Sequence, residues 1–574
     1  MTTTHHTRAC QALLFAALLA LLSACGGGDD PSMATSSSSG TTGGTSSGTS
    51  GGTSGGTSGG SSGGSTAATT DVLTYHYDSM RTGQNLTETV LTPANVTTAT
   101  FGLLRTVPAD APVDAAPLVA THVSIGGSSH TVVYVASENA TIYAYDADSG
   151  ALLAQASMLG SGETASDMVH NCDQVSPKIG ITATPVIDRK QGPNGTLYVV
   201  AMSLDSGSAH HQRLHALDLT TLADRVPAVE ITATAQGTGS GSSNGILTFD
   251  PSQYKERGAL LVANSQIYTV WASHCDVGAY NGWVIAYNEA TLAQTASLNY
   301  TPNGTMGATW NVAGLAADSS GALYGMSGNG TFDTVLTNAG FPVGGDFGNG
   351  VMKLASTATS LAVSDFYEAT NTVSESNGDV DLGSGSPLLL PDQTDAMGAI
   401  RHLLIGAGKD GNVLLLDRDN LGKYNGSTDT ALQRLVGGLS GGLFAAFAYY
   451  NSTVYVADVG GSLKAFAIDH AQLSSSPVSQ TQATFPFPGA SPSVSANGKT
   501  NAILWALNSS TGSAAVLRAY NPADLSQEYY DSTQAASDRD AFGNGEKFIT
   551  PVVANGKVFV GTPSGVAIFG LLSP

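Results

Sequence analysis

The chain has 574 residues, only 11% of them are Asp, Glu, Lys or Arg, and the formal net charge is −22. An acidic surface repels phosphate backbones, which argues against nucleic acid as a partner. Lipid, protein, glycan and small-molecule partners are all compatible with this composition.

Residues 1–24 have the features of a secretory signal. Arg8 precedes the apolar run 12–22, which is too short to span a membrane as a helix. The segment "LSAC", Leu22 to Cys25, resembles the lipobox of bacterial lipoproteins, and the resemblance implies diacylglyceryl attachment at Cys25. Gly26 then implies sorting to the outer membrane, so we expect an envelope lipoprotein that faces the periplasm or the exterior. Plain signal cleavage with an incidental Cys25 is the alternative.

Residues 25–70 are predicted to be a lipidated, disordered linker. Between Thr35 and Thr69 the chain is almost entirely Gly, Ser and Thr, so this segment cannot bury apolar area. A flexible chain of this kind has a mean reach of roughly 30–40 Å. We expect it to hold the folded part, residues 71–574, near a membrane while leaving that part free to rotate.

One sequence unit recurs eight times in the folded part. It consists of a short strand with small residues, a "VYV"-like strand and an "AYDA"-like strand, as in "APLVA", "TVVYVAS" and "TIYAYDADSG" of the first copy. Short apolar strands separated by Gly, Asn, Asp and Ser turns, repeated at this spacing, predict an all-β, eight-bladed β-propeller. A solenoid is the competing architecture, but it requires an open end and capping repeats.

The two ends of the repeat region complement each other. The eighth copy stops after its third strand, at 568–572, whereas a spare strand, 100–110, precedes the first copy. We predict that this strand completes the last blade and closes the ring, because closure pairs both exposed edges.

The units resemble the PQQ-type repeats of quinoprotein dehydrogenases and of the propeller lipoprotein of the outer-membrane assembly machinery. The resemblance covers about 74–572, and the opening "YHYDSMRTGQNLTETVLTPANV" is similar to that of a bacterial group of PQQ-like propellers. It implies a PQQ-like, quinoprotein alcohol dehydrogenase-like fold.

Two cysteines remain after Cys10 leaves with the signal and Cys25 takes lipid. Loops between blades share a face with the hairpins that join strands two and three, so Cys172 and Cys275 are expected on the same face of neighbouring blades. Export favours a Cys172–Cys275 disulfide, which contributes about 4 kcal/mol in the chain-entropy model. A metal site of these cysteines with His170 and His274 is the alternative.

Long loops on the same face predict a binding surface. His210 and His211 lie in one of these loops, but adjacent histidines in a Gly/Ser-rich loop are more often solvated than metal-bound, so we assign no metal site. Tyr254, Tyr280 and Phe347 are aromatic side chains that suit a glycan.

Blade five contains a candidate catalytic group. "NGDVDLGSGSPLLL" places Asp379 and Asp381 before its first strand, and "KDGNVLLLDR" places Lys409 on its second hairpin. PQQ alcohol dehydrogenases resemble this arrangement. The resemblance implies Asp379 or Asp381 as the base that takes the hydroxyl proton and Lys409 as the group that polarises the quinone carbonyl, in a site for PQQ and Ca²⁺. The family's tryptophan floor has no obvious counterpart in this sequence, and Trp310 or Trp271 is the candidate for it.

Several departures from that family weaken the enzymatic interpretation. The sequence has no adjacent cysteine pair, no regular Trp docking motifs and no haem-attachment motif, and "KDG" is a good turn in any blade. We therefore predict a lipid-anchored propeller that binds or scaffolds a protein or glycan partner through its loop-rich face. The alternative is a PQQ- and Ca²⁺-dependent dehydrogenase of an alcohol or sugar. The deciding observation is whether Asp381 and Lys409 line a cavity wide enough for a flat tricyclic ring.

Overall fold

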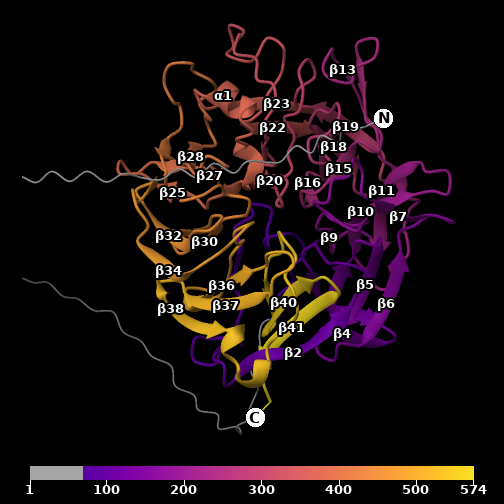
Figure 1. Cartoon of the computed structure of the whole chain (residues 1–574), viewed down its shortest axis with the longest axis vertical. Coiled ribbons are helices and arrows are strands. Elements are labelled where there is room, and N and C mark those ends of the chain that lie inside the picture. Colours follow the sequence, from indigo (N-terminus) through magenta and orange to yellow (C-terminus); the bar gives the residue numbers. More distant parts are fainter. Residues whose placement is uncertain (1–68, 574) are drawn as a thin grey trace, which may run out of the picture. The chain divides into compact units, whose positions relative to one another are not determined.

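Eight blades, each built on four antiparallel strands, follow one another around a central axis (Figure 1). The computed structural model describes residues 69–573, so the predicted signal, Cys25 and most of the linker lie outside the described residues. No helix among the described residues is long and apolar enough to cross a membrane. The eight-bladed propeller predicted from the repeats is confirmed.

The blades share one strand order, from the axis outward. Blades one to four consist of β3 (Leu118–Ile125), β4 (Ser128–Ala136), β5 (Thr141–Asp146) and β6 (Leu152–Ser157); β9 (Val186–Asp188), β10 (Thr196–Leu204), β11 (His210–Asp218) and β12 (Val229–Glu230); β16 (Leu261–Ala263), β17 (Gln266–Ser273), β18 (Trp283–Asn288) and β19 (Gln294–Asn299); and β20 (Ala316–Ala317), β21 (Leu323–Met326), β22 (Val351–Thr357) and β23 (Ser360–Tyr367). Blades five to eight consist of β24 (Leu388–Leu389), β27 (Leu403–Ala407), β28 (Val413–Asp417) and β29 (Gln433–Leu435); β30 (Ala448–Tyr450), β31 (Thr453–Ala457), β32 (Ser462–Asp469) and β34 (Ser479–Thr484); β35 (Ser493–Asn497), β36 (Thr500–Asn508), β37 (Val516–Asn521) and β38 (Asp524–Asp531); and β39 (Val552–Ala554), β40 (Lys557–Thr562), β41 (Gly565–Leu571) and β2 (Phe101–Pro108).

The remaining elements are short. They are β1 (Gln84–Asn85), β7 (Thr164–Asp167), β8 (Lys178–Ile179), β13 (Thr234–Gln236), β14 (Ile246–Thr248), β15 (Tyr254–Glu256), β25 (Gln393–Thr394), β26 (Ile400–Arg401), β33 (Gln472–Leu473), the helix α1 (Thr372–Asn377) and the 3₁₀ turns Leu382–Ser384, Ser532–Gln534 and Ala536–Asp538. The strand β15 pairs with the C-terminal end of β17 in blade three, whereas β16 pairs with the N-terminal end of β17.

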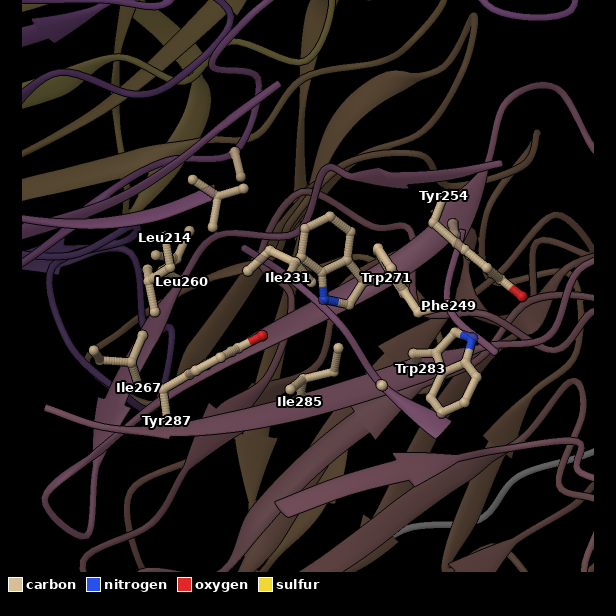
Figure 2. Packing of buried hydrophobic residues seen from close by; sticks show 14 of the residues in the cluster. Leu214, Ile231, Phe249, Tyr254, Leu260, Ile267, Trp271, Trp283, Ile285 and Tyr287 are labelled. Carbon is tan, nitrogen blue, oxygen red and sulfur yellow. The ribbon is translucent and has the colours of Figure 1, made fainter. Parts of the chain in front are cut away.

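Neighbouring blades bury both faces of the strands between them. The middle strands therefore read as continuous apolar runs rather than as alternating patterns, for example 132–135 and 403–407, all of which are buried. Figure 2 shows such a core between blades two and three, where Trp271 and Trp283 are fully buried beside Leu260 and Tyr287. Trp271 donates to the Thr269 hydroxyl in this core and does not reach the axis, so the expectation that it could floor a ligand site is wrong.

The ring closes as predicted from the incomplete eighth repeat. The strand β2 pairs antiparallel with β41, from Phe101 opposite Leu571 to Pro108 opposite Gly565. Phe101 is fully buried against Trp505, Tyr530 and Phe569, so the closing strand is packed as well as hydrogen-bonded. Closure removes the two edges that an open array would expose.

The segment 72–85 crosses the axis and contacts every blade; we call it the axial segment. In Figure 1 it is the indigo coil at the centre of the ring. Its backbone and side chains form hydrogen bonds with one residue at the innermost strand of each blade. In blade order these residues are Val119, Ile187, Leu260, Ala317, Leu389, Tyr449, Val494 and Val553; Leu260 directly precedes its strand and the others lie within theirs. One coil thus ties all eight blades together at the axis.

Candidate active site

The loops that enter the blades build a cavity on the axis. One position recurs in its wall, the residue four places before the first strand of each blade. Six of the eight residues at this position line the cavity or a small chamber that adjoins it: Asp114, Thr182, Arg257, Val312, Phe444 and Phe548. The same register of the repeat therefore supplies the wall from blade after blade.

The cavity has a volume of about 350 Å³. The adjoining chamber, of about 20 Å³, is reached past Arg257 and Phe548, and Tyr75 of the axial segment lines it. The charged and aromatic residues in the cavity wall are Lys255, Arg257, Asp276, Trp310, Asp381, Lys409, Phe444, Phe487 and Phe548. Asp381, Lys409 and Trp310, which the sequence singled out, thus lie in one wall.

Lys409 and Asp381 form an ion pair on the blade-five side. Lys409 lies on the turn between β27 and β28, and its Nζ is 2.6 Å from a carboxylate oxygen of Asp381. The backbones of the two residues are also hydrogen-bonded, because the Lys409 N–H donates to the Asp381 carbonyl at 2.8 Å. The second carboxylate oxygen of Asp381 accepts from the Asn329 N–H at 2.6 Å and from the Trp310 indole at 3.5 Å.

Gly328 makes this arrangement possible. A Cβ at Gly328 would lie 2.2 Å from the Asp381 carboxylate and 2.7 Å from the Trp310 indole nitrogen, closer than real Cβ atoms approach. Any side chain there would therefore separate the indole from the carboxylate.

The two aspartates have different surroundings. The Asp381 side chain is 3% exposed and lines the cavity, whereas the Asp379 side chain is 65% exposed and does not. Asp379 accepts from Lys409 Nζ at 2.9 Å and from the Asn329 side chain at 3.0 Å. The structure therefore places Asp381 at the cavity and leaves Asp379 to orient Lys409.

Burial and charge oppose each other at this ion pair. Desolvation raises the pKa of Asp381, and the Lys409 ammonium offsets only part of that rise. Desolvation alone would lower the pKa of Lys409, but Asp381 and Asp379 outweigh it, so the pKa of Lys409 is raised. The lysine thus stays charged while the carboxyl moves toward neutrality.

Cys172 and Cys275 are joined in a disulfide, as expected from the sequence, with Cα atoms 5.6 Å apart. Both residues line the cavity, and the bond links the loop before blade two to the second hairpin of blade three. Because the two sulfurs are bonded to each other, neither is a thiolate ligand, and the disulfide takes the place of the alternative metal site with His170 and His274.

His274 is buried in the wall, where burial lowers its pKa to about 3. His210 and His211 begin β11 and pair with Ser166 and Glu230, away from the cavity.

The glycan-binding aromatics suggested by the sequence are buried. Tyr254 and Tyr280 are 4% and 2% exposed in the core of Figure 2, and Phe347 is 7% exposed in the next core. Their rings pack between blades, so they offer no face to a sugar and that prediction is wrong for all three.

Sequence reasoning missed two cations in the blade-three wall. Lys255 lies in β15 and Arg257 directly follows it; alternation along the strand turns both toward the axis and Glu256 into the blade. Lys255 is 7% exposed, and its Nζ donates to the Thr182 hydroxyl at 3.1 Å. The Arg257 guanidinium stacks on the Phe548 ring at 3.5 Å. The signal that could have found them is "YKERG", which places Arg257 at the recurrent wall position.

Four aromatic side chains, which we call the aromatic belt, follow one another around the cavity. The ring centroids of Trp310 and Phe444 are 6.0 Å apart, those of Phe444 and Phe487 5.2 Å, and those of Phe487 and Phe548 6.0 Å. Arg257 lies between the two ends of the belt, 3.5 Å from Phe548 and 5.9 Å from Trp310. The belt suits a flat, apolar body.

No protein-family model and no curated protein matches the sequence. Among solved structures, the chain is similar to a quinohemoprotein alcohol dehydrogenase from Pseudomonas putida, with 14% identity, 87% of this chain and 80% of that chain covered, and a TM-score of 0.56. The enzyme of the same type from Comamonas testosteroni gives 14% identity, coverage of 88% and 81%, and a TM-score of 0.56. A europium-containing methanol dehydrogenase gives 12% identity, coverage of 87% and 98%, and a TM-score of 0.53. The chain thus shares the eight-bladed propeller fold of these quinoprotein dehydrogenases.

Proposed function

We propose that the cavity binds a flat quinone of the PQQ class and that the protein oxidises an alcohol or sugar there. One observation carries the proposal: Asp381 and Lys409 of blade five and Trp310 from the loop before blade four converge on a single cavity of about 350 Å³. This is the arrangement that the sequence alone left undecided.

The residues of this chain support that chemistry in distinct ways. A bound quinone would supply the acceptor for a hydride, that is, two electrons and one proton, from the substrate carbon. Asp381 is the base for the substrate hydroxyl, and its raised pKa brings it closer to the working range of a general base. Lys409 brings a positive charge to a carbonyl oxygen that gains electron density. Trp310 and the aromatic belt hold the ring and keep water from it.

The residues at Asp381 do not fit the expected Ca²⁺. Lys409 and the Asn329 N–H already engage its two carboxylate oxygens. Within residues 69–573 no three His, Cys, Asp or Glu side chains are grouped to hold a metal ion. Calcium prefers six to eight oxygen ligands. We therefore assign no step to calcium and assign the positive charge beside Asp381 to Lys409.

Titration of the purified full chain with PQQ, with and without Ca²⁺, tests this proposal. We expect quinone absorbance to shift on binding and an artificial dye to be reduced with at least one alcohol or sugar of a panel. Lys409→Met should abolish dye reduction, whereas Lys499→Met, which removes an exposed lysine, should not. Absence of PQQ binding, or full turnover by Lys409→Met, would contradict the proposal.

A partner-binding face is the second candidate. Met168, Val277 and Phe487 are 43%, 42% and 44% exposed, and they lie in or beside the loops that carry the cavity wall. Exposed apolar side chains on one loop-rich face suit a protein surface. Pull-down from envelope extracts with wild type and with Val277→Asp tests it, and recovery of the same proteins by both would contradict it. Acylation of Cys25 and outer-membrane location remain predictions that mass spectrometry of the membrane fraction can check.

A further inference from the structure

The two cations of the blade-three wall lack the carboxylate partners that comparable cations of the described chain have. Arg81, which is buried and also forms no ion pair, instead donates to three backbone carbonyls and to the Thr74 hydroxyl. Lys464 lies 2.5 Å from Asp458, Arg418 lies 3.2 Å from Asp318, and Lys409 lies 2.6 Å from Asp381. Within residues 69–573, neither Lys255 nor Arg257 has a carboxylate oxygen within 4.0 Å. A buried charge is costly unless it is paired. Lys255 is buried and Arg257 is half-buried, and both face one cavity, so together they indicate a missing anionic partner.

The acidic groups nearby do not supply that partner. Asp114 and Glu138 face the cluster from blade one, and Glu546 and Lys547 face it from the loop before blade eight. Burial, and then the charges of Glu138 and Glu546, raise the pKa of Asp114 well above its usual range, which favours its neutral form. Glu138 accepts from the Gly180 N–H at 2.7 Å. Within residues 69–573, none of Lys255, Arg257 and Lys547 forms an ion pair with these carboxyl groups.

Arg257 also defines where an anionic group meets a flat ring. Its guanidinium is held from one side by the Phe548 ring, and among the described residues its N–H groups have no hydrogen-bond acceptor. A planar guanidinium presents paired N–H groups that match a carboxylate. Because Arg257 lies between the ends of the aromatic belt, a ring resting on the belt carries its substituents to Arg257.

We propose that Lys255 and Arg257 form a carboxylate-binding subsite for a planar aromatic ligand whose ring lies against the belt of Trp310, Phe444, Phe487 and Phe548. The subsite rests on the proposed function only in taking this cavity as the ligand site. It adds the residues that recognise the carboxylate groups of such a ligand, and it assigns this recognition to blade three rather than to blade five.

Binding of naphthalene-2,6-dicarboxylate tests the subsite, with naphthalene-2,6-dimethanol as the neutral probe of similar shape. Trp310 lines the cavity, whereas Trp271, Trp283 and Trp505 are 0% exposed, so quenching of tryptophan fluorescence reports on the cavity, and calorimetry confirms the affinity. We expect the dicarboxylate to bind the full chain at least tenfold more tightly than the diol, because charge-assisted bonds to the two cations exist only for the former. Equal affinities for both probes would overturn the proposal.

Substitutions then assign the charge recognition. Arg257→Gln and Lys255→Gln should each weaken the dicarboxylate by about 10–100-fold and leave the diol unchanged. Arg257→Lys should restore part of the affinity, and Lys499→Gln, a matched loss of one exposed positive charge, should have no effect. The diol also reports whether a variant keeps a folded cavity. A variant that binds both probes as the wild type does would overturn the role of that residue.

The outcomes separate this proposal from the proposed function. Tight dicarboxylate binding without dye reduction in the presence of PQQ supports the subsite and overturns the oxidoreductase. Dye reduction by Arg257→Gln with the wild-type affinity for PQQ overturns the subsite and supports the oxidoreductase. Lys409→Met should keep dicarboxylate affinity within about threefold, because the Lys409 ammonium of the wild type is already engaged by Asp379 and Asp381.

Discussion

The blade-five and blade-three walls of the cavity each place positive charge on the axis, but they hold it differently. In the blade-five wall, two aspartates contact the Lys409 ammonium, and backbone bonds fix the pair. In the blade-three wall, Lys255 has one hydroxyl acceptor and Arg257 has an aromatic ring. Pairing inside the protein orients a group, whereas lack of pairing leaves charge for a ligand. The comparison thus separates a wall that positions reacting groups from a wall that selects the molecule bound.

The largest expected effect lies in the blade-five wall and separates its two aspartates. Asp381→Asn should lower dye reduction by about 10²–10⁴-fold, because it removes the base at the cavity. Asp379→Asn should lower it less than about tenfold, since the Asp379 side chain is exposed and, among the described residues, hydrogen-bonds to Lys409 and Asn329. Initial rates with saturating PQQ measure both. Equal losses would mean that the two carboxylates are not distinguished by their exposure.

The next effect concerns stability and should differ in sign between the walls. Lys409→Met leaves the buried Asp381 carboxylate with Asn329 and Trp310 alone, so we expect a loss of about 2–3 kcal/mol in the free energy of unfolding. Arg257→Gln removes a charge that has no partner, so we expect no loss or a small gain. Urea unfolding followed by circular dichroism compares them, with Lys499→Met and Lys499→Gln as controls. A similar loss of unfolding free energy in Lys409→Met and Arg257→Gln would contradict the proposed difference between a cation with carboxylate partners and one without.

The smallest effect is a pH dependence confined to the blade-three wall. Burial, opposed in part by Glu138, lowers the pKa of Lys255 to about 8, and burial lowers the pKa of Arg257 to about 10. An anion favours the charged lysine, so affinity for naphthalene-2,6-dicarboxylate should be full below pH 8 and fall as the pH rises through that value. We expect about a tenfold loss between pH 7 and 9.5 in the wild type. Lys255→Gln should show a flat profile over this range, and a wild-type profile that is equally flat would contradict the assignment.

Much of the fold followed from the sequence because its physics is local and repeated. Turn residues and apolar runs predicted the blades, and the missing strand of the eighth copy predicted the pairing of Phe101–Pro108 with Gly565–Leu571. The axial segment escaped prediction. It has no strand or helix period, and its hydrogen bonds go to blades far away in the sequence.

The candidate site was predictable only in part. The hairpin and the Asp-rich segment identified Lys409 and both aspartates, but two carboxylates two residues apart cannot be ranked without the backbone. The structure ranks them through a positive φ of 56° at Asp379, which accompanies its turn away from the cavity. Lys255 and Arg257 were missed because an isolated "KER" reads as an exposed strand end, and only the ring brings it beside Phe548.

The axial segment has a mechanical consequence. Any pull on the chain from its N-terminal side enters the ring at residues 70–72 and then passes along 72–85, which is hydrogen-bonded at or beside the innermost strand of every blade. The force is therefore distributed over hydrogen bonds to all eight blades, and it does not separate a single strand from a single sheet. A force applied at residues 70–72 would therefore act on the centre of the ring and not on the loops that form the cavity.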